Sequence, residues 1–215
     1  MDDHELITPP ETLVAEAIRG GDPDAAVRYL ERMVADWRRN KDYSINWIAS
    51  LLSFIGRRMG QDAVEEALRD FGARYLADRR GTNVDVPARK RAEAVARGMK
   101  ANGADVQMSE DDEKIELSFR CGSGGMLIDG GAYDDERGYL TLTGPAPVTF
   151  GRESLPVYCA HCSVNNEMEG IERQGAPYTI EHPPAAPGER CVHHVYKDVS
   201  RIPASVYERV GKTKP

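Results

Sequence analysis

The spacing of apolar residues changes at Gly103, and this change constrains the fold more than any other feature of the sequence. Before Gly103, apolar residues recur at intervals of three and four, which is typical of amphipathic helices. After it, short segments alternate apolar and polar side chains, as residues 114–121 do, which indicates strands. The sequence therefore predicts an α+β fold in which a helical first part packs on a mostly antiparallel sheet.

The same patterns divide the chain into four segments. We expect a disordered tail at 1–10, a helical region at 11–103, an α+β region with metal and ligand sites at 104–200, and a C-terminal tail at 201–215. Helices are predicted at 12–19, 23–40, 42–59, 62–79, 86–103 and 203–210, and strands at 106–108, 114–121, 126–128, 139–142, 148–150, 155–159, 178–180 and 191–196.

Helical periodicity also predicts which side chains of the first part are buried. Trp37 and Trp47 fall at core-like positions of their helices. The helix at 42–59 carries the widest apolar surface and should be the most buried of the set. The basic run at 89–91 lies among glutamates and alanines, and we interpret it as a solvated helix face.

Length and composition exclude several classes of function. A chain of 215 residues can bury a core that needs no disulfide or metal to hold it. Its net charge of -7 gives no positively charged surface for nucleic acid. No apolar run approaches the roughly 20 residues that span a bilayer, and the start of the chain is acidic where a secretory signal is basic. We therefore expect a cytoplasmic protein with reduced thiols, without nucleic-acid or membrane partners. The sequence leaves a homo-oligomer open.

All four cysteines lie in the second half of the chain, together with four of its five histidines. Cys159 and Cys162 are separated by two residues, a gap that lets one turn present two ligands to zinc. The predicted zinc ligands are Cys121, Cys159, Cys162, Cys191 and His193, with His161 as a further candidate. Four thiolates would close the site, whereas three protein ligands and water would leave it open for chemistry. Two alternatives stay open, namely buried thiols that act as small hydrophobes and a redox Cys-x-x-Cys pair.

Other polar residues near the cysteines are candidates for catalysis and ligand binding. His161 and Glu167 are the predicted catalytic residues, because either could move a proton to or from a metal-bound water. Arg120, Gly122, Ser123 and Gly124 are the predicted ligand-binding residues. Arg120 could hold a carboxylate, and the glycine-rich loop after it favours a tight turn or an anion-binding nest. This loop lacks the Gly-Lys-Ser/Thr ending of a phosphate loop.

The second half of the chain resembles a known family over residues 105–197. The resemblance rests on the strand that ends at Cys121, on the segment 158–162, and on Cys191 with the strand that follows it. In this layout the chain is similar to the L-2-amino-thiazoline-4-carboxylate hydrolase-like family and to small-molecule-binding domains of the vinyl-reductase type. The resemblance implies a pocket for a small organic molecule beside a cysteine-rich zinc site. In the sensor relatives one glutamate completes the metal site, and Glu167 is the comparable residue here.

The function predicted from the sequence is that of a zinc-dependent hydrolase acting on a small organic acid or heterocycle. In this hypothesis the metal polarises the substrate or lowers the pKa of bound water, while His161 or Glu167 moves the proton. The alternative is a non-catalytic, sensor-like binding domain in which a closed four-cysteine zinc site only fixes the wall of the pocket.

Overall fold

The structure is a computed structural model that describes residues 3–76, 83–135 and 138–215. Contacts within the chain divide it into two compact units, Met1–Ile45 and Asn46–Pro215, and the boundary lies inside a single helix. The fold is α+β with an antiparallel sheet, as the sequence predicts. Among the described helices, none combines the length and the apolar character needed to cross a membrane.

The first unit is helical from near its start. It contains α1 (Asp3–Ile7), α2 (Pro10–Arg19) and the first part of α3 (Pro23–Met59). Helix α1 lies in the segment expected to be a tail, and the Tyr29 hydroxyl links it to α3 by donating to Glu5 at 2.9 Å. The start of α3 is capped by Asp22, whose carboxylate accepts from the backbone N–H of Ala25 at 2.9 Å.

Helix α3 is continuous where the sequence analysis predicts two helices, at 23–40 and 42–59. The polar residues between them contain neither proline nor glycine, so nothing there breaks the helix. The prediction of buried tryptophans is also wrong, because Trp37 is 39% and Trp47 59% exposed. The stretch 42–59 nevertheless buries Ile45, Ala49, Leu52 and Ser53, more described residues than any other helix predicted in the first part, although Leu51 on it is exposed. Periodicity identifies an apolar face but does not show whether another element covers it.

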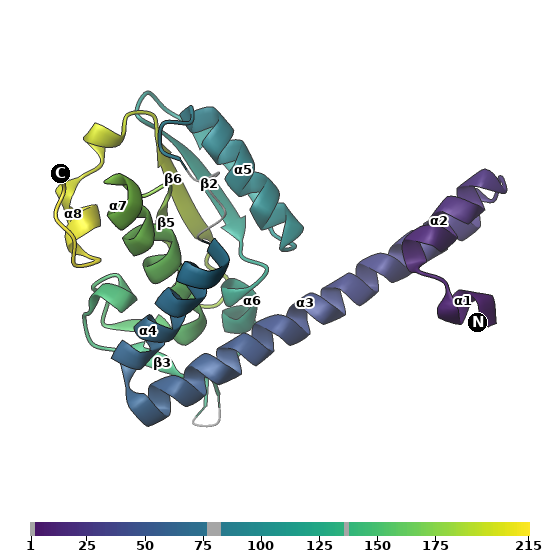
Figure 1. Cartoon of the computed structure of the whole chain (residues 1–215), viewed down its shortest axis with the longest axis horizontal. Coiled ribbons are helices and arrows are strands. Elements are labelled where there is room, and N and C mark those ends of the chain that lie inside the picture. Colours follow the sequence, from purple (N-terminus) through teal and green to yellow (C-terminus); the bar gives the residue numbers. More distant parts are fainter. Residues whose placement is uncertain (1–2, 77–82, 136–137) are drawn as a thin grey trace. The chain divides into compact units, whose positions relative to one another are not determined.

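The main sheet of the second unit has four antiparallel strands in the order β1-β2-β6-β5. Their bounds are Asp105–Glu110 for β1, Lys114–Arg120 for β2, Ile180–His182 for β5 and Cys191–Tyr196 for β6. Helix α5 (Ala88–Ala101) packs across one face of this sheet (Figure 1). A smaller sheet pairs β3 (Thr141–Thr143) with β4 (Ser154–Pro156).

Several short segments predicted as strands are helical instead. Residues 126–128 belong to α6 (Gly124–Asp129), and most of 148–150 belongs to the 3-10 turn η2 (Pro147–Thr149). Short apolar runs fit a buried strand and a buried helical turn equally well, so periodicity alone does not separate them. The remaining helical elements are α4 (Gln61–Phe71), η1 (Gly72–Leu76), η3 (Val157–Cys159), η4 (Cys162–Met168), α7 (Glu169–Gln174), η5 (Val199–Arg201) and α8 (Ala204–Glu208). The end of the helix predicted at 62–79 lies outside the described residues.

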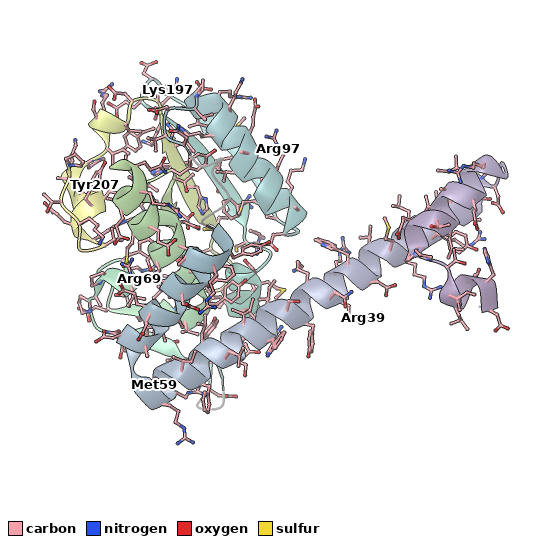
Figure 2. All side chains as sticks on the ribbon, in the orientation of Figure 1. Arg39, Met59, Arg69, Arg97, Lys197 and Tyr207 are labelled. Carbon is pink, nitrogen blue, oxygen red and sulfur yellow. The ribbon has the colours of Figure 1, made fainter. Side chains whose placement is uncertain are left out.

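Two hydrophobic clusters form the core of the second unit. The larger joins α4, the small sheet, η4 and the C-terminal segment, and it includes Tyr207 of α8 (Figure 2). The smaller lies between α5 and the main sheet, where Ile115, Leu117 and Phe119 of β2 face Ala92 of α5. The thiols considered below lie where these two clusters meet.

Arg91 of α5 is buried, which corrects the prediction of a solvated face at 89–91. Its side chain is 1% exposed, and its guanidinium donates to the carbonyls of Val86 at 3.1 Å, Tyr178 at 2.9 Å and Tyr196 at 2.5 Å. Burial lowers the pKa of Arg91. The residue therefore ties α5 to the segments that carry β5 and β6.

Candidate functional site at the junction of the two cores

The structure brings all four thiols to the junction of the two hydrophobic clusters. Cys159 and Cys162 pack with the larger cluster, and Cys121 and Cys191 with the smaller one. All four are free thiols. Burial raises the pKa of Cys159, Cys162 and Cys191, and the proximity of the other thiols adds to each of these shifts. At neutral pH these three thiols are therefore protonated, which disfavours the redox interpretation of the Cys-x-x-Cys pair.

The arrangement of the thiols does not fit zinc as it stands. Within residues 3–76, 83–135 and 138–215, no group of three or more His, Cys, Asp or Glu side chains is placed to hold a metal ion. A closed zinc site needs about four ligands at roughly 2.0–2.3 Å from one point. Zinc at this position thus stays a prediction that metal analysis must test.

The glycine-rich loop before α6 is shaped by packing against the protein itself. A Cβ atom on Gly122 would lie 1.8 Å from the backbone oxygen of Asn102, and one on Gly124 would lie 2.9 Å from the Cys159 sulfur. Ser123 is buried and lies 3.2 Å from the Cys121 sulfur. These glycines let the loop approach Asn102 and Cys159 closely.

The other predicted ligand-binding residue, Arg120, is exposed and forms an ion pair with Asp129 at 3.5 Å. Ligand binding at this loop remains a prediction.

His161 is held in one orientation beside the Cys162 thiol. Its Nδ1 lies 2.6 Å from the carbonyl oxygen of Tyr158, which can only accept, so in the neutral ring Nδ1 carries the proton. The ring nitrogen Nε2 is then the acceptor that faces the Cys162 sulfur at 3.5 Å. The predicted catalytic histidine is therefore a neighbour of the thiols.

Glu167 lies against the backbone of β5. It is 0% exposed, and its Oε1 accepts from the backbone N–H of Glu181 at 2.6 Å and from the Arg209 guanidinium. Arg209 also donates to the carbonyl of Glu181 at 2.9 Å. Burial raises the pKa of Glu167 to about 8, although the Arg209 charge opposes this shift. Through these contacts Glu167 holds the backbone of β5 in place.

Glu181, which the sequence analysis did not single out, lies at the centre of the site. Residues Glu181 and His193 are direct partners across β5 and β6, so their side chains share the sheet face that α5 covers. The Glu181 Oε1 accepts from Asn166 at 2.8 Å and from Thr179 at 3.2 Å, and it lies 3.8 Å from the His193 Nε2. Its charge also raises the pKa of Cys162.

The Glu181 and His193 side chains keep unsatisfied polar atoms in spite of their burial. They are 2% and 4% exposed, yet the Glu181 Oε2 and the His193 Nδ1 have no hydrogen-bond partner among the described residues. Burial lowers the pKa of His193, so its ring is neutral at neutral pH. The Phe119 ring packs against the imidazole in a T-shaped arrangement, with 4.8 Å between the ring centroids. Buried polar atoms normally have partners, so two orphans in one place indicate a site for a ligand.

A pocket of about 320 Å³ opens beside this pair. One wall comes from α5 and includes Val95, Gly98 and Met99. The opposite wall is polar and comes from η4, α7 and the two strands, with Asn165, Asn166, Arg173, Gln174, Thr179, Glu181 and His193. An apolar wall facing a few convergent polar groups is typical of small-molecule sites.

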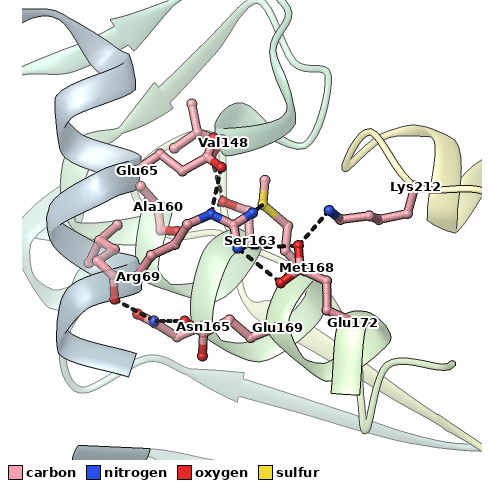
Figure 3. A network of polar contacts seen from close by, with 11 residues as sticks. Glu65, Arg69, Val148, Ala160, Ser163, Asn165, Met168, Glu169, Glu172 and Lys212 are labelled. Atoms are coloured by element: carbon pink, nitrogen blue, oxygen red, sulfur yellow. Dashed lines mark hydrogen bonds and ion pairs between the residues drawn. The ribbon is translucent and has the colours of Figure 1, made fainter. Parts of the chain in front are cut away.

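A network of polar contacts fixes the η4–α7 wall of this pocket to α4 (Figure 3). Arg69 of α4 donates to Glu65 at 2.8 Å and to Glu172 of α7 at 3.0 Å. Asn165 donates to the backbone oxygen of Leu68 at 2.7 Å. The wall that carries Asn166 is therefore fixed in position relative to α4.

Comparisons of the chain with family models, with curated proteins and with solved structures found no match.

Proposed function

We propose that the chain is an enzyme that hydrolyses a small organic acid or heterocycle bound in the pocket between α5 and the η4–α7 wall. The observation that carries the proposal is the buried Glu181–His193 pair, whose Oε2 and Nδ1 lack partners among the described residues while both side chains line the pocket. Clusters of buried titratable groups in a pocket are typical of catalytic sites.

The pair can act as a general base. When the His193 proton resides on Nε2, which faces Glu181, Nδ1 carries the lone pair and can accept a proton from water. The 3.8 Å contact is longer than a hydrogen bond, and contacts of this kind shorten when substrate binds. Asn166 and Thr179 fix the Glu181 carboxylate, so the carboxylate can orient the imidazole.

The polar wall favours an acidic substrate. The Arg173 side chain is 44% exposed, lies at the pocket, and is 3.7 Å from its only described carboxylate partner, Glu169. A guanidinium held this loosely is available to a substrate carboxylate. Apolar Val95 and Met99 would cover the other face of a flat ring.

The four thiols carry no step of this proposal. Zinc held by Cys121, Cys159, Cys162 and Cys191 would supply Lewis-acid chemistry or fix the wall of the site, as predicted from the sequence. The proposal for Glu181 and His193 does not depend on the metal, and no proton transfer is assigned to it.

The test combines turnover with variants of the pair. The purified protein is incubated with small heterocyclic and acyclic carboxylic acids, 2-amino-thiazoline-4-carboxylate among them, and mass spectrometry detects the addition of water. We expect Glu181→Gln and His193→Asn to reduce turnover by roughly 100-fold or more, the usual contribution of a general base. His194→Asn is the matched control, because His194 lies on the opposite face of β6 and pairs with Glu116 at 3.0 Å.

A non-catalytic binding domain is the second candidate. It is favoured by the two donors on the Glu181 Oε1, which make the carboxylate a fixed acceptor for a ligand N–H. Compounds that bind with chemical-shift changes at the pocket but are never hydrolysed would support it. Turnover that survives in both Glu181→Gln and His193→Asn would refute the catalytic role of the pair.

A further inference from the structure

A second cavity, of about 360 Å³, is lined by two arginines, Arg152 and Arg209, and by two carboxylates, Glu181 and Glu189. Phe150 and Arg152 come from the turn after η2, His182 from the end of β5, Glu189 from the connection that follows β5, and Arg209 from the position directly after α8.

Arg152 has hydrogen-bonding capacity to spare. Its Nη1 donates to the carbonyl of Pro183 at 2.9 Å, and within the described part of the chain no carboxylate lies close enough to form an ion pair with it. A guanidinium carries five N–H donors in a fork that matches a carboxylate or a phosphate. The positive charge of Arg152 also acts on Cys159, where it partly opposes the rise in the pKa of the thiol.

Arg209 adds a buried donor without an acceptor. One of its terminal nitrogens binds Glu167 and the backbone of Glu181, but its Nε is buried and has no partner among the described residues. The guanidinium lies over the Phe150 ring, 4.8 Å from its centroid. This stacking fixes the plane of the guanidinium.

The backbone at Phe150 is strained in a way that serves this arrangement. Its φ of 57° makes it the one non-glycine residue with a positive φ among those the structure describes. A bulky side chain in this region costs about 1–3 kcal/mol and persists only where the surroundings impose it. Here the conformation accompanies a ring that lies under Arg209 at the wall of the cavity.

One oxygen of each of the two carboxylates at the cavity is engaged. The Glu189 Oε2 accepts from the backbone N–H of Ala185 at 2.7 Å and of Ala186 at 3.2 Å. The Glu181 Oε1 accepts from Asn166 and Thr179. Among the described residues the Glu181 Oε2 is an acceptor at the cavity without a partner, while the donors without one are the Arg209 Nε and the N–H groups of Arg152 beyond its bond to Pro183.

We propose that this cavity is a binding site for a small oxyanion, a carboxylate or a phosphate, held by Arg152 and Arg209. Glu181 lines both this cavity and the pocket proposed for the substrate, but Arg152 and Arg209 line this cavity alone, and the proposal does not depend on the function proposed above.

The experiment is a titration of the full chain, labelled with ¹⁵N, with sodium phosphate and with sodium acetate at constant ionic strength, and with sodium chloride as reference. Saturable changes are expected at the Arg152 and Arg209 side chains and at Gly151. Tighter binding of phosphate identifies a phosphate-bearing ligand, and tighter binding of acetate a carboxylate. Either preference supports the site.

Variants then test the assignment. Arg152→Gln should weaken binding about tenfold or more, because it removes a charged hydrogen-bond donor. Glu189→Gln, which keeps an acceptor for the two N–H groups but removes the charge, should tighten binding. This opposite effect cannot result from a loss of folding. Arg120→Gln is the control for an exposed arginine elsewhere and should leave binding unchanged. No saturable change beyond that of chloride, or equal affinities for all variants, would overturn the proposal.

Discussion

Replacement of the buried Arg91 should destabilise the second unit more than replacement of any exposed arginine on the same helix. In Arg91→Met the three carbonyls of Val86, Tyr178 and Tyr196 lose their donor, and α5 loses its tie to the strands. Each hydrogen bond from a charged donor is worth about 1.5–3 kcal/mol net. Relief of the cost of burying the cation offsets part of this loss. We expect the free energy of unfolding to fall by about 3–5 kcal/mol.

The assay is urea denaturation followed by far-ultraviolet circular dichroism. Arg89→Met is the matched control, because Arg89 is on the same helix, is largely exposed, and pairs with Glu93 at 3.3 Å and Glu110 at 3.5 Å. Loss of such surface pairs should cost less than about 1 kcal/mol. Arg91→Lys keeps the charge but not the fork of donors, and should give an intermediate loss. A loss below about 1 kcal/mol in Arg91→Met would refute the view that this guanidinium holds α5 on the sheet.

Three further predictions concern the core and the thiols. The Glu167 carboxyl has a pKa of about 8 in the folded state and about 4.5 in the unfolded state. Between these pH values the folded state holds one extra proton. The free energy of unfolding should therefore fall as pH rises through this range, by at most about 1.4 kcal/mol per pH unit. Glu167→Gln should flatten this slope in denaturation measured at several pH values, and an unchanged slope would contradict the assignment. Gly122→Ala should lower the free energy of unfolding by about 1–3 kcal/mol, because the added Cβ would overlap a backbone oxygen. Gly98→Ala should raise it by about 0.5–1 kcal/mol, because a Cβ there meets no atom within 4 Å. Equal melting temperatures of the two variants would contradict this prediction. The zinc prediction expects one equivalent of metal by elemental analysis, lost in Cys159→Ala and Cys191→Ala, and a metal-free protein whose stability a chelator leaves unchanged would rule zinc out.

The parts of the fold that depend on local pattern could be predicted from the sequence. Strands β2 and β6 alternate apolar and polar residues along their length, and the predicted bounds match Lys114–Arg120 and Cys191–Tyr196 to within one residue. The strand predicted at 126–128 is wrong because an apolar run this short shows neither a helical nor a strand period. The break predicted near residue 41 failed because polar residues without proline or glycine continue a helix.

The central residues of the site could not be predicted, since their roles depend on contacts between distant segments. Glu181 faces His193 only because β5 pairs with β6 in one register, and a shift of one residue would turn it to the other face. From the sequence alone, Arg91 and Arg209 are typical of exposed cations. In the fold Arg91 is buried and Arg209 is partly buried, and each binds a backbone carbonyl of a residue far away in the sequence. The two-residue gap between Cys159 and Cys162 pointed to the neighbourhood of the proposed site but gave no sign of Glu181.

The exposure of both tryptophans on α3 has a practical consequence for spectroscopy. Trp37 and Trp47 are the only two indoles in the chain, and both are in contact with water in the folded state. Intrinsic tryptophan fluorescence therefore reports on the solvent around this helix and is nearly blind to the packing of the sheet. Melting of the sheet should leave the emission maximum almost unchanged, whereas any molecule that covers α3 should move it to shorter wavelength.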